Sequence, residues 1–441
     1  MSISFDILDI LHDWNFWDGE LYTGIPRQAY VDRILSLIMP RRVVAVIGIR
    51  RAGKSFILRQ TALRLSGEVG ARNILFVNFE DPRLGVSTWR ELERIFNIYL
   101  REIKPRGVPY VILDEVHRVK DWERWVRSAG ELDRARIIVS GSTSKIMSDE
   151  LSTLLTGRHS DVYVFPLSFE ELLLFRGIPL DRVRFVRASI REFMEYGGFP
   201  EVVLGRDKKS IVLGYFDDII HRDVLLRCQI DRPMKLRELA RFYMTAVSKP
   251  VTFRSIEKFL ELSVDTVEKY TSCLETAMLI FMLERYSPKI REQIRAPRKV
   301  YAMDVSFPNI IGFRITRNIG QTFENMVAID LIRLKNADPR VEIYYWRNRQ
   351  GKEVDFVVKL EDEILALIET TYEADPTELR EKASNLITAS RQLNCGDIFI
   401  ITYDYETKVR IRNREVPVIP YWRWALRIHK KLFERIKKTP L

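Results

Sequence analysis

The stretch Gly48-Ile49-Arg50-Arg51-Ala52-Gly53-Lys54-Ser55 decides the fold of this chain. It follows the apolar run Val43–Ile47, which is typical of a buried strand, and it precedes helix-like residues that begin at Phe56. In a strand, G-x-x-x-x-G-K-S loop and helix, backbone N–H groups surround phosphates and the helix N-terminus favours their negative charge. The stretch therefore predicts a P-loop, because a glycine turn followed by a chance lysine would leave the strand, the spacing and the helix unexplained.

Each residue type in this loop has an expected role at a nucleotide. Gly48 and Gly53 allow the required backbone angles, and Lys54 is expected to reach the β- and γ-phosphates. The Ser55 hydroxyl is expected to bind Mg²⁺, so ATP and Mg²⁺ are the predicted cofactors. The predicted nucleotide-binding residues are Gly48, Ile49, Arg50, Arg51, Ala52, Gly53, Lys54, Ser55 and Phe56.

A second motif, Val111-Ile112-Leu113-Asp114-Glu115, completes the predicted site. Asp114 at the end of the strand is expected to hold Mg²⁺ directly or through water, and Glu115 is expected to be the general base for the attacking water. The adjacent glutamate favours a hydrolytic ATPase over a kinase-type P-loop protein, which transfers phosphate to a bound acceptor. The alternative is that the two carboxylates cap the next helix.

Two further residues complete the predicted catalytic set of Lys54, Glu115, Ser142 and Arg158. The strand 135–140 ends in Ser140-Gly141-Ser142-Thr143-Ser144, where Ser142 and Thr143 would lie beside the γ-phosphate or would cap the following helix. Arg158 is the candidate for stabilising charge on the transferring phosphate, either in cis or from a neighbouring subunit. A surface role for this arginine is the alternative.

Composition limits the class of protein and the kind of partner. No apolar run approaches the ~18 residues that span a bilayer, and the N-terminus lacks a signal pattern, so we expect a soluble, cytoplasmic protein with no membrane partner. A net charge of +11 suits a nucleic-acid partner, although a composition rich in Arg, Lys and Glu is also expected of a thermophile protein. The three cysteines, Cys228, Cys273 and Cys395, are odd in number and widely separated, which predicts buried thiols rather than disulfides or a zinc site.

Four parts follow one another along the chain. Strands alternating with helices predict an α/β fold with a parallel sheet for residues 1–175, the P-loop ATPase core with its N-terminal segment. In residues 1–40, the aromatic and basic stretches 14–17 and 22–28 are placed to cover an adenine ring or, equally, to pack onto the core. Residues 176–230 are expected to form a helical lid, residues 231–305 a winged-helix domain, and residues 306–441 a restriction-nuclease-like α/β domain.

The predicted winged helix rests on two helices followed by a hairpin. Ser263 caps the second helix, and a basic wing joins strands at 279–283 and 299–303. Asp265 and Glu268 would put negative charge on the recognition helix, so DNA contact and a purely architectural role both stay open.

The predicted nuclease-like core rests on three carboxylates. Glu324 on a helix, Asp355 in one strand and Glu369 near the end of the next can converge on a divalent metal. The pattern D…(D/E)-x-K has Thr371 where the lysine is expected. Lys352 or Lys359 could substitute, but the simpler interpretation is an inactive fold kept for binding or assembly.

These motifs, in this order, resemble an archaeal family of AAA-type ATPases of the additional-strand P-loop class, which carry a winged helix and a C-terminal PD-(D/E)XK nuclease-like domain of unassigned function. The shared stretches also include Asn78–Asp81, Phe165–Glu170, Gly197–Glu201 and Glu353–Phe356. The resemblance implies Mg²⁺-dependent ATP binding and hydrolysis, and it suggests nucleic-acid transactions.

The sequence therefore predicts an ATPase coupled to DNA binding or remodelling, with single-stranded, duplex or branched DNA and a second copy of the chain as candidate partners. The alternatives are an ATP-dependent switch or scaffold acting on protein partners, and an ATP-licensed metal-dependent nuclease.

Overall fold

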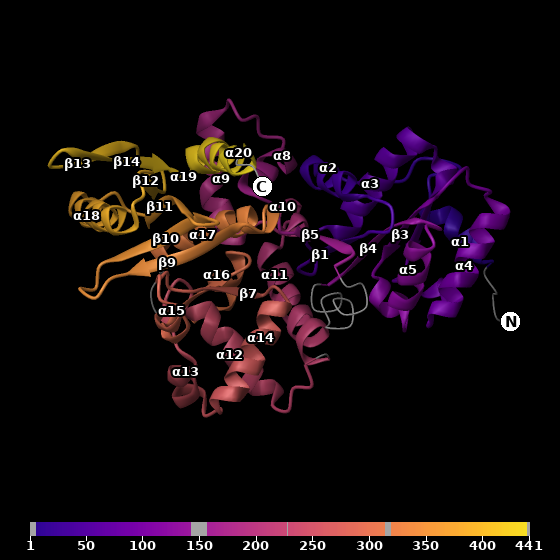
Figure 1. Cartoon of the computed structure of the whole chain (residues 1–441), viewed down its shortest axis with the longest axis horizontal. Helices are drawn as coiled ribbons and strands as arrows, with labels where there is room; N and C mark the ends of the chain where they lie inside the picture. The colour runs from indigo at the N-terminus through magenta and orange to yellow at the C-terminus, as the bar shows by residue number, and fades with distance from the viewer. Residues whose placement is uncertain (1–5, 143–156, 227, 314–318, 439–441) are drawn as a thin grey trace. The chain divides into compact units, whose positions relative to one another are not determined.

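The computed structural model describes residues 6–142, 157–226, 228–313 and 319–438 (Figure 1). The chain forms two compact units, Met1–Val164 and Phe165–Leu441. None of the helices among the described residues is both long and apolar enough to cross a bilayer.

The first unit is a parallel five-stranded sheet with helices between its strands. Its strand order is β2-β3-β4-β1-β5. The strands are β1 (Val43–Gly48), β2 (Ile74–Asn78), β3 (Tyr110–Asp114), β4 (Arg136–Ser142) and β5 (His159–Val164). The helices are α1 (Ile7–Trp14), α2 (Gln28–Leu37), α3 (Lys54–Val69), α4 (Trp89–Glu102) and α5 (Trp122–Glu131). The predicted α/β fold is confirmed here, including the extra strand β4 between the P-loop strand β1 and the Walker B strand β3.

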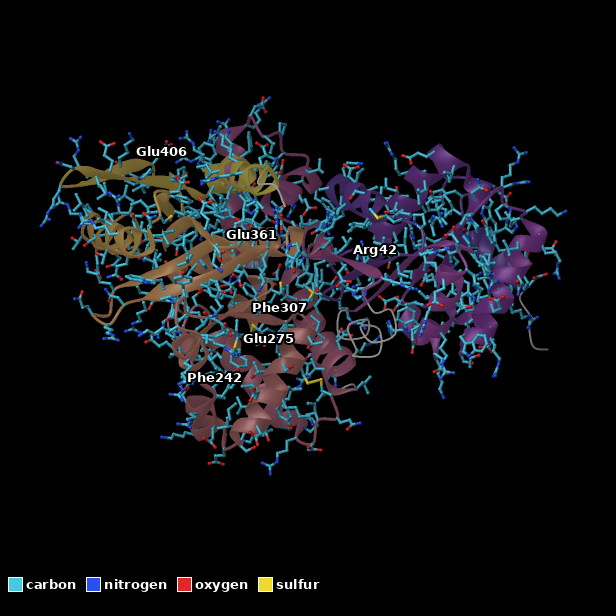
Figure 2. The ribbon with its side chains drawn as sticks, in the orientation of Figure 1. Arg42, Phe242, Glu275, Phe307, Glu361 and Glu406 are labelled. Atoms are coloured by element: carbon cyan, nitrogen blue, oxygen red, sulfur yellow. A yellow bond between two sulfur atoms is a disulfide. The ribbon has the colours of Figure 1, made fainter. Side chains whose placement is uncertain are left out.

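The second unit begins with helices and a small sheet. The helices are α8 (Phe169–Phe175), α9 (Val183–Tyr196), α10 (Pro200–Leu204), α11 (Lys208–Asp218), α12 (Pro233–Thr245), α13 (Phe253–Leu260), α14 (Val264–Thr276), α15 (Ile290–Arg295) and α16 (Ser306–Ile311). A π-helical turn, Ile219–Leu225, follows α11. The sheet has the order β6-β8-β7, from β6 (Pro250–Val251), β7 (Ile280–Leu283) and β8 (Arg298–Ala302). Phe307, labelled in Figure 2, packs in this core with its ring centroid 5.4 Å from that of Phe199.

The rest of the second unit is a six-stranded mixed sheet with the order β13-β14-β12-β11-β10-β9. Its strands are β9 (Val341–Arg347), β10 (Glu353–Leu360), β11 (Glu363–Thr371), β12 (Ile398–Thr402), β13 (Thr407–Ile411) and β14 (Arg414–Pro420). Its helices are α17 (Ile319–Ala337), α18 (Pro376–Leu393), α19 (Tyr421–Arg423) and α20 (His429–Lys438), with a π-helical turn, Trp424–Ile428, before α20. Strands β9, β10 and β11 pair antiparallel, whereas β11, β12 and β14 run parallel.

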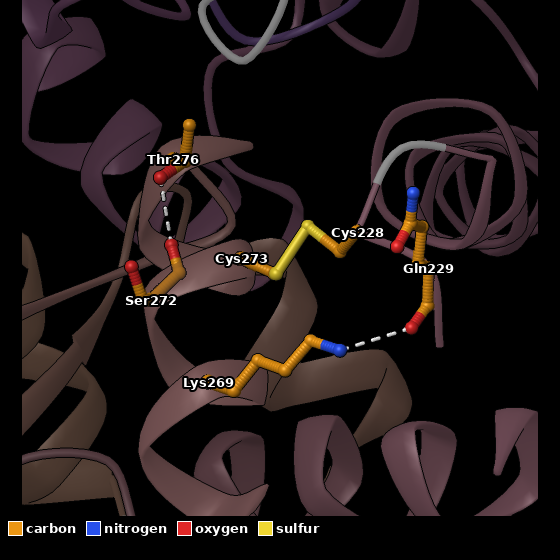
Figure 3. The surroundings of a disulfide bond; sticks show 6 residues. All are labelled: Cys228, Gln229, Lys269, Ser272, Cys273 and Thr276. Atoms are coloured by element: carbon orange, nitrogen blue, oxygen red, sulfur yellow. Dashed lines mark hydrogen bonds between the residues drawn. A yellow bond between two sulfur atoms is a disulfide. The ribbon is translucent and has the colours of Figure 1, made fainter. Parts of the chain in front are cut away.

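The prediction of three thiols was wrong for two of the cysteines. Cys228 and Cys273 form a disulfide with a Cα–Cα distance of 6.3 Å (Figure 3), while Cys395 is buried and free. The two partners are 45 residues apart. Only the packing of α14 against the segment after the π-helical turn brings them together, so their spacing could not reveal the pair.

Candidate functional site

The P-loop joins β1 to α3 with a backbone that depends on two glycines. A Cβ atom at Gly48 would lie 2.2 Å from the carbonyl oxygen of Val164, so only glycine lets β5 approach this closely. Gly53 has a φ of +94°, in the left-handed region that favours glycine. The loop therefore turns tightly enough to aim the first backbone N–H groups of α3 at an anion.

Lys54 is the first residue of α3, and its side chain is buried against the loop. Its Nζ donates hydrogen bonds to the carbonyl oxygens of Gly48 at 3.0 Å and Ile49 at 3.2 Å. Its positive charge also lowers the pKa values of Asp114 and Glu115 against the effect of burial. The ammonium group therefore lies where both the loop and the two carboxylates feel its charge.

Asp114 ends β3 and is only 1% exposed. Its Oδ1 accepts a hydrogen bond from the Ser140 hydroxyl, whereas Oδ2 is buried and makes no hydrogen bond to any described residue. Burial raises the pKa of Asp114, and Ser140, Ser55 and Lys54 oppose that rise. A buried carboxylate oxygen without a hydrogen-bond donor fits a hard cation such as Mg²⁺, which prefers oxygen ligands.

Glu115 directly follows Asp114, and a hydrogen bond from its backbone N–H holds it in place. It has a φ of +56°, and its N–H donates to Ser140 Oγ at 3.1 Å. The carboxylate Oε2 lies 3.3 Å from His117 Nδ1. Burial raises the pKa of Glu115 and Lys54 opposes this. A carboxylate with raised proton affinity beside a phosphate site is suited to accept a proton from water.

Ser140 is the site residue that sequence reasoning missed. It is fully buried on β4, and its hydroxyl contacts both Asp114 and the backbone of Glu115. Ser142 also lies on β4, opposite Gly48 in the register, but its side chain and all of Thr143 lie outside the described residues. The sequence did contain a signal for Ser140. It lies two residues before the predicted Ser142, and residues two apart on a strand point to the same face.

Arg158 is not brought to the site in its own chain. Its carbonyl accepts a hydrogen bond from the N–H of Val43, the first residue of β1. Strands β1 and β5 pair in parallel from Val43 with His159 to Gly48 with Val164, so Arg158 lies at the edge opposite the P-loop. A six-residue strand is roughly 20 Å long, which excludes contact in cis. The Arg158 guanidinium is 3.2 Å from Glu131 Oε1.

The segment before the core is tied to the P-loop by polar contacts. Arg27 Nη1 donates to the carbonyl oxygen of Ala52 at 2.8 Å, and the Gln60 amide holds the backbone of Thr23, Ile25 and Arg27. Next to this segment Tyr22 is 77% exposed and meets the exposed ring of Phe56 edge to face, with centroids 6.1 Å apart. Two exposed rings therefore flank the start of α3.

The carboxylates predicted for a nuclease-like core do come together, but with unexpected partners. Glu324 and Asp355 both contact Lys299, and Glu369 contacts Lys382. The two lysines predicted as substitutes are elsewhere. Lys352 donates to the hydroxyls of Ser384 and Thr388, and Lys359 pairs with Glu342.

The predicted recognition helix is partly covered. The disulfide of Cys273 and a hydrogen bond from Lys269 Nζ to the carbonyl oxygen of Gln229, 3.0 Å long, fix the 228–229 segment against α14 (Figure 3). The wing is also partly neutralised, since Arg298 pairs with Glu284 and Lys299 is buried among carboxylates. Both findings reduce the basic surface available to a polyanion.

Comparison with known proteins agrees with the geometry of the first unit. Residues 40–173 match the family described as an AAA domain. This segment is therefore similar to AAA domains. Two families described as domains of unknown function, DUF8612 and DUF4143, match residues 187–313 and 319–424.

Two proteins are similar to this chain over most of its length, not only over the AAA-like segment. The uncharacterized protein MJ1544 of Methanocaldococcus jannaschii is 27% identical over 410 residues, which cover 88% of this chain and 89% of that protein. An uncharacterized protein of Haemophilus influenzae is 27% identical over 367 residues, covering 80% and 89%. Among solved structures, the Walker-type ATPase of Pyrococcus abyssi has a TM-score of 0.40 and 14% identity, and covers 65% of this chain and 96% of that one.

Proposed function

We propose that the AAA domain binds and hydrolyses ATP at the edge formed by the P-loop and the carboxyl ends of β3 and β4. One observation carries this proposal: Ser140 holds Asp114 by its side chain and Glu115 by its backbone, both within the field of Lys54. Such an arrangement separates two adjacent carboxylates into different roles. Asp114 is held as a ligand, and Glu115 is held as a base.

The chain's own residues account for each part of the reaction. The loop N–H groups and Lys54 bind the phosphates. To do so, Lys54 gives up its hydrogen bonds to the carbonyl oxygens of Gly48 and Ile49 and donates to phosphate oxygens. Glu115 orients the attacking water and accepts its proton. Ser55 and Asp114 would hold Mg²⁺, which supplies neutralising charge to the phosphates when bound. The base of the nucleotide is proposed to stack on Tyr22 and Phe56, whose exposed rings lie side by side.

Arg158 is proposed to act only in trans. Because it lies at the opposite edge of the sheet from the P-loop of its own chain, it can reach phosphates only in an assembly of several copies. A homo-oligomer is therefore part of this proposal.

A second candidate function is an ATP-dependent switch acting on a protein partner. The covered face of α14 and the paired wing residues favour it over DNA remodelling through the winged helix. DNA coupling stays a prediction, and it would need another surface of the chain.

Steady-state ATP hydrolysis by the full chain tests both candidates. Lys54→Ala should abolish nucleotide binding or turnover, and Glu115→Gln should keep ATP bound while turnover falls by about 10²-fold or more. Normal turnover by Glu115→Gln would refute the assigned base. Stimulation by single-stranded, duplex or branched DNA would favour the remodeller, and turnover indifferent to all three would favour the switch.

A further inference from the structure

The second unit contains a buried cluster of opposite charges that the ATPase does not use. It joins four elements of the mixed-sheet region to β8 of the small sheet. The acidic members are Glu324, Glu353, Asp355 and Glu369, and the basic members are Lys299 and Lys382. A nuclease-like core would hold a divalent metal among Glu324, Asp355 and Glu369, so the cluster can be tested for its fit to such an ion.

Lys299 occupies the centre of the carboxylates. Its Nζ lies 3.0 Å from Glu324 Oε1, 2.8 Å from Glu353 Oε1 and 3.1 Å from Asp355 Oδ1, and the side chain is 2% exposed. The ammonium group donates hydrogen bonds to Glu324 and Asp355 and forms an ion pair with Glu353. Divalent ions sit about 2.0–2.6 Å from their oxygen ligands, so an ion bound by these three oxygens would overlap the nitrogen.

The remaining oxygens of Asp355 and Glu369 are also engaged. Asp355 Oδ2 accepts hydrogen bonds from the Thr370 N–H at 2.9 Å and the Thr370 hydroxyl at 3.0 Å. Lys382 Nζ lies 2.8 Å from Glu369 Oε2 and 3.7 Å from Asp355 Oδ2. The described residues contain no group of three or more His, Cys, Asp or Glu side chains arranged to hold a metal ion. The cluster does not fit the metal that the nuclease-like pattern implies.

The charges of the cluster compensate one another without an added ion. Burial raises the pKa of Glu324 to about 7 and also raises that of Glu369, so both acids resist ionisation. Lys382 and Lys299 hold the pKa of Asp355 below its usual range. The surrounding carboxylates raise the pKa of Lys299, which stays charged. The Lys299 and Lys382 ammonium groups therefore both face Asp355, the carboxylate whose pKa is lowered.

We propose that the Lys299 ammonium takes the place of a divalent cation in this cluster, so that the native domain binds no metal there. Removing the ammonium group should open a site for Mn²⁺ among Glu324, Glu353 and Asp355. Because Lys299 comes from β8, this internal cation also fastens the small sheet to β10 and α17. The inference is independent of the ATPase proposal, since the cluster and the P-loop lie in different units.

Mn²⁺ binding to the full chain tests the proposal. All proteins carry Asp114→Asn, which removes the carboxylate proposed to bind metal at the P-loop. Free Mn²⁺ is measured by electron paramagnetic resonance with the parent, Asp355→Asn, Lys299→Met and Lys299→Met/Asp355→Asn. Lys359→Met is the matched control, because that lysine pairs with Glu342 on the same sheet but outside the cluster.

The parent and the Lys359→Met control should bind no Mn²⁺ tightly, while Lys299→Met should gain one site per chain that Asp355→Asn abolishes. If Lys299→Met fails to fold without metal, its refolding in Mn²⁺ but not in chelator supports the same conclusion. The proposal that the Lys299 ammonium group takes the place of a divalent cation is overturned if Lys299→Met does not refold even with Mn²⁺. It is also overturned if Lys299→Met folds but binds no Mn²⁺. A parent that binds Mn²⁺ and loses it on Asp355→Asn also overturns it.

Discussion

Ser140 shows how one hydroxyl can organise two carboxylates. It donates to Asp114 and accepts from the N–H of Glu115, so its loss leaves a buried acceptor and a buried donor without a partner. We predict that Ser140→Ala lowers kcat by roughly 10–100-fold while ATP binding persists, the range typical of residues that position ligands. Steady-state kinetics and fluorescent-nucleotide binding measure the two effects separately.

A purely structural role for Ser140 would not move a pH profile. The hydroxyl opposes the raised pKa of Asp114, so its removal should raise that pKa further and shift the acid limb of the pH–kcat profile to higher pH. Ser140→Thr keeps the hydroxyl and should keep the profile of the native protein. An alanine variant with native kcat and an unmoved profile would contradict the assignment.

Glu324 predicts a dependence of stability on pH. Tyr301 and Lys299 from β8 and Asp355 from β10 face its carboxyl, and burial raises its pKa to about 7. An unfolded glutamate releases its proton near pH 4.5. Between these values the folded chain binds more protons, so stability falls as the pH rises from about 4.5 to 7, by on the order of 3 kcal/mol from this group.

Urea unfolding between pH 4.5 and 8 measures this slope. Glu324→Gln cannot titrate and should lack this component of the slope, while Glu363→Gln, an exposed glutamate of β11, should keep it. Equal slopes in the native chain and Glu324→Gln would mean that Glu324 has an ordinary pKa.

At the scale of elements, the features that could be predicted from the sequence are those whose residues are contiguous in the chain. The strand, glycine loop and lysine of the P-loop are contiguous, as are Asp114 and Glu115 at the end of β3, so both motifs could be found without a structure. The parallel sheet was predicted from the alternation of strands and helices and is confirmed, and β4 lies between β1 and β3 as the resemblance to additional-strand ATPases implies.

What escaped prediction depends on partners far apart in the chain. Ser140 contacts Asp114 across 26 residues, and Lys299 contacts Asp355 across 56. Lys382, which pairs with Glu369, comes from α18 rather than from β11, so no spacing rule could locate it. The position of Arg158, in contrast, was accessible from the sequence, because a residue directly before a parallel strand lies at the edge opposite the loop that follows β1.

The disulfide gives a prediction at the scale of α14. It closes a loop of 45 residues and should stabilise the second unit by about 4 kcal/mol through the entropy of the unfolded chain. A reducing agent should therefore lower the melting temperature of the native protein and have no effect on Cys273→Ser. Cys395→Ser, which removes the free thiol, should respond to the reductant as the native protein does. Equal melting temperatures of the native chain with and without reductant would show that the bond is not formed.

At the scale of the whole molecule, the proposal that Arg158 acts in trans predicts that full activity needs an assembly of several copies. A chain with Arg158→Ala keeps its base but lacks the arginine that it would offer a neighbour, and a chain with Glu115→Gln keeps the arginine but lacks the base. Each variant should be inactive by itself, because an arginine that stabilises the phosphoryl transition state contributes about 10³–10⁵ in rate.

Mixing the two variants distinguishes action in trans from a local defect. At equal concentrations a site works only when its own chain has Glu115 and its neighbour has Arg158, so random assembly restores roughly a quarter of native turnover. Glu131→Gln removes the ion pair of Arg158 and is the matched control, since an exposed pair contributes little to stability and its loss should leave turnover intact. Absence of recovery on mixing would exclude Arg158 as a group supplied between subunits. Native activity of Arg158→Ala alone would exclude it from catalysis, and with it the argument from this arginine that the ATPase works as an oligomer.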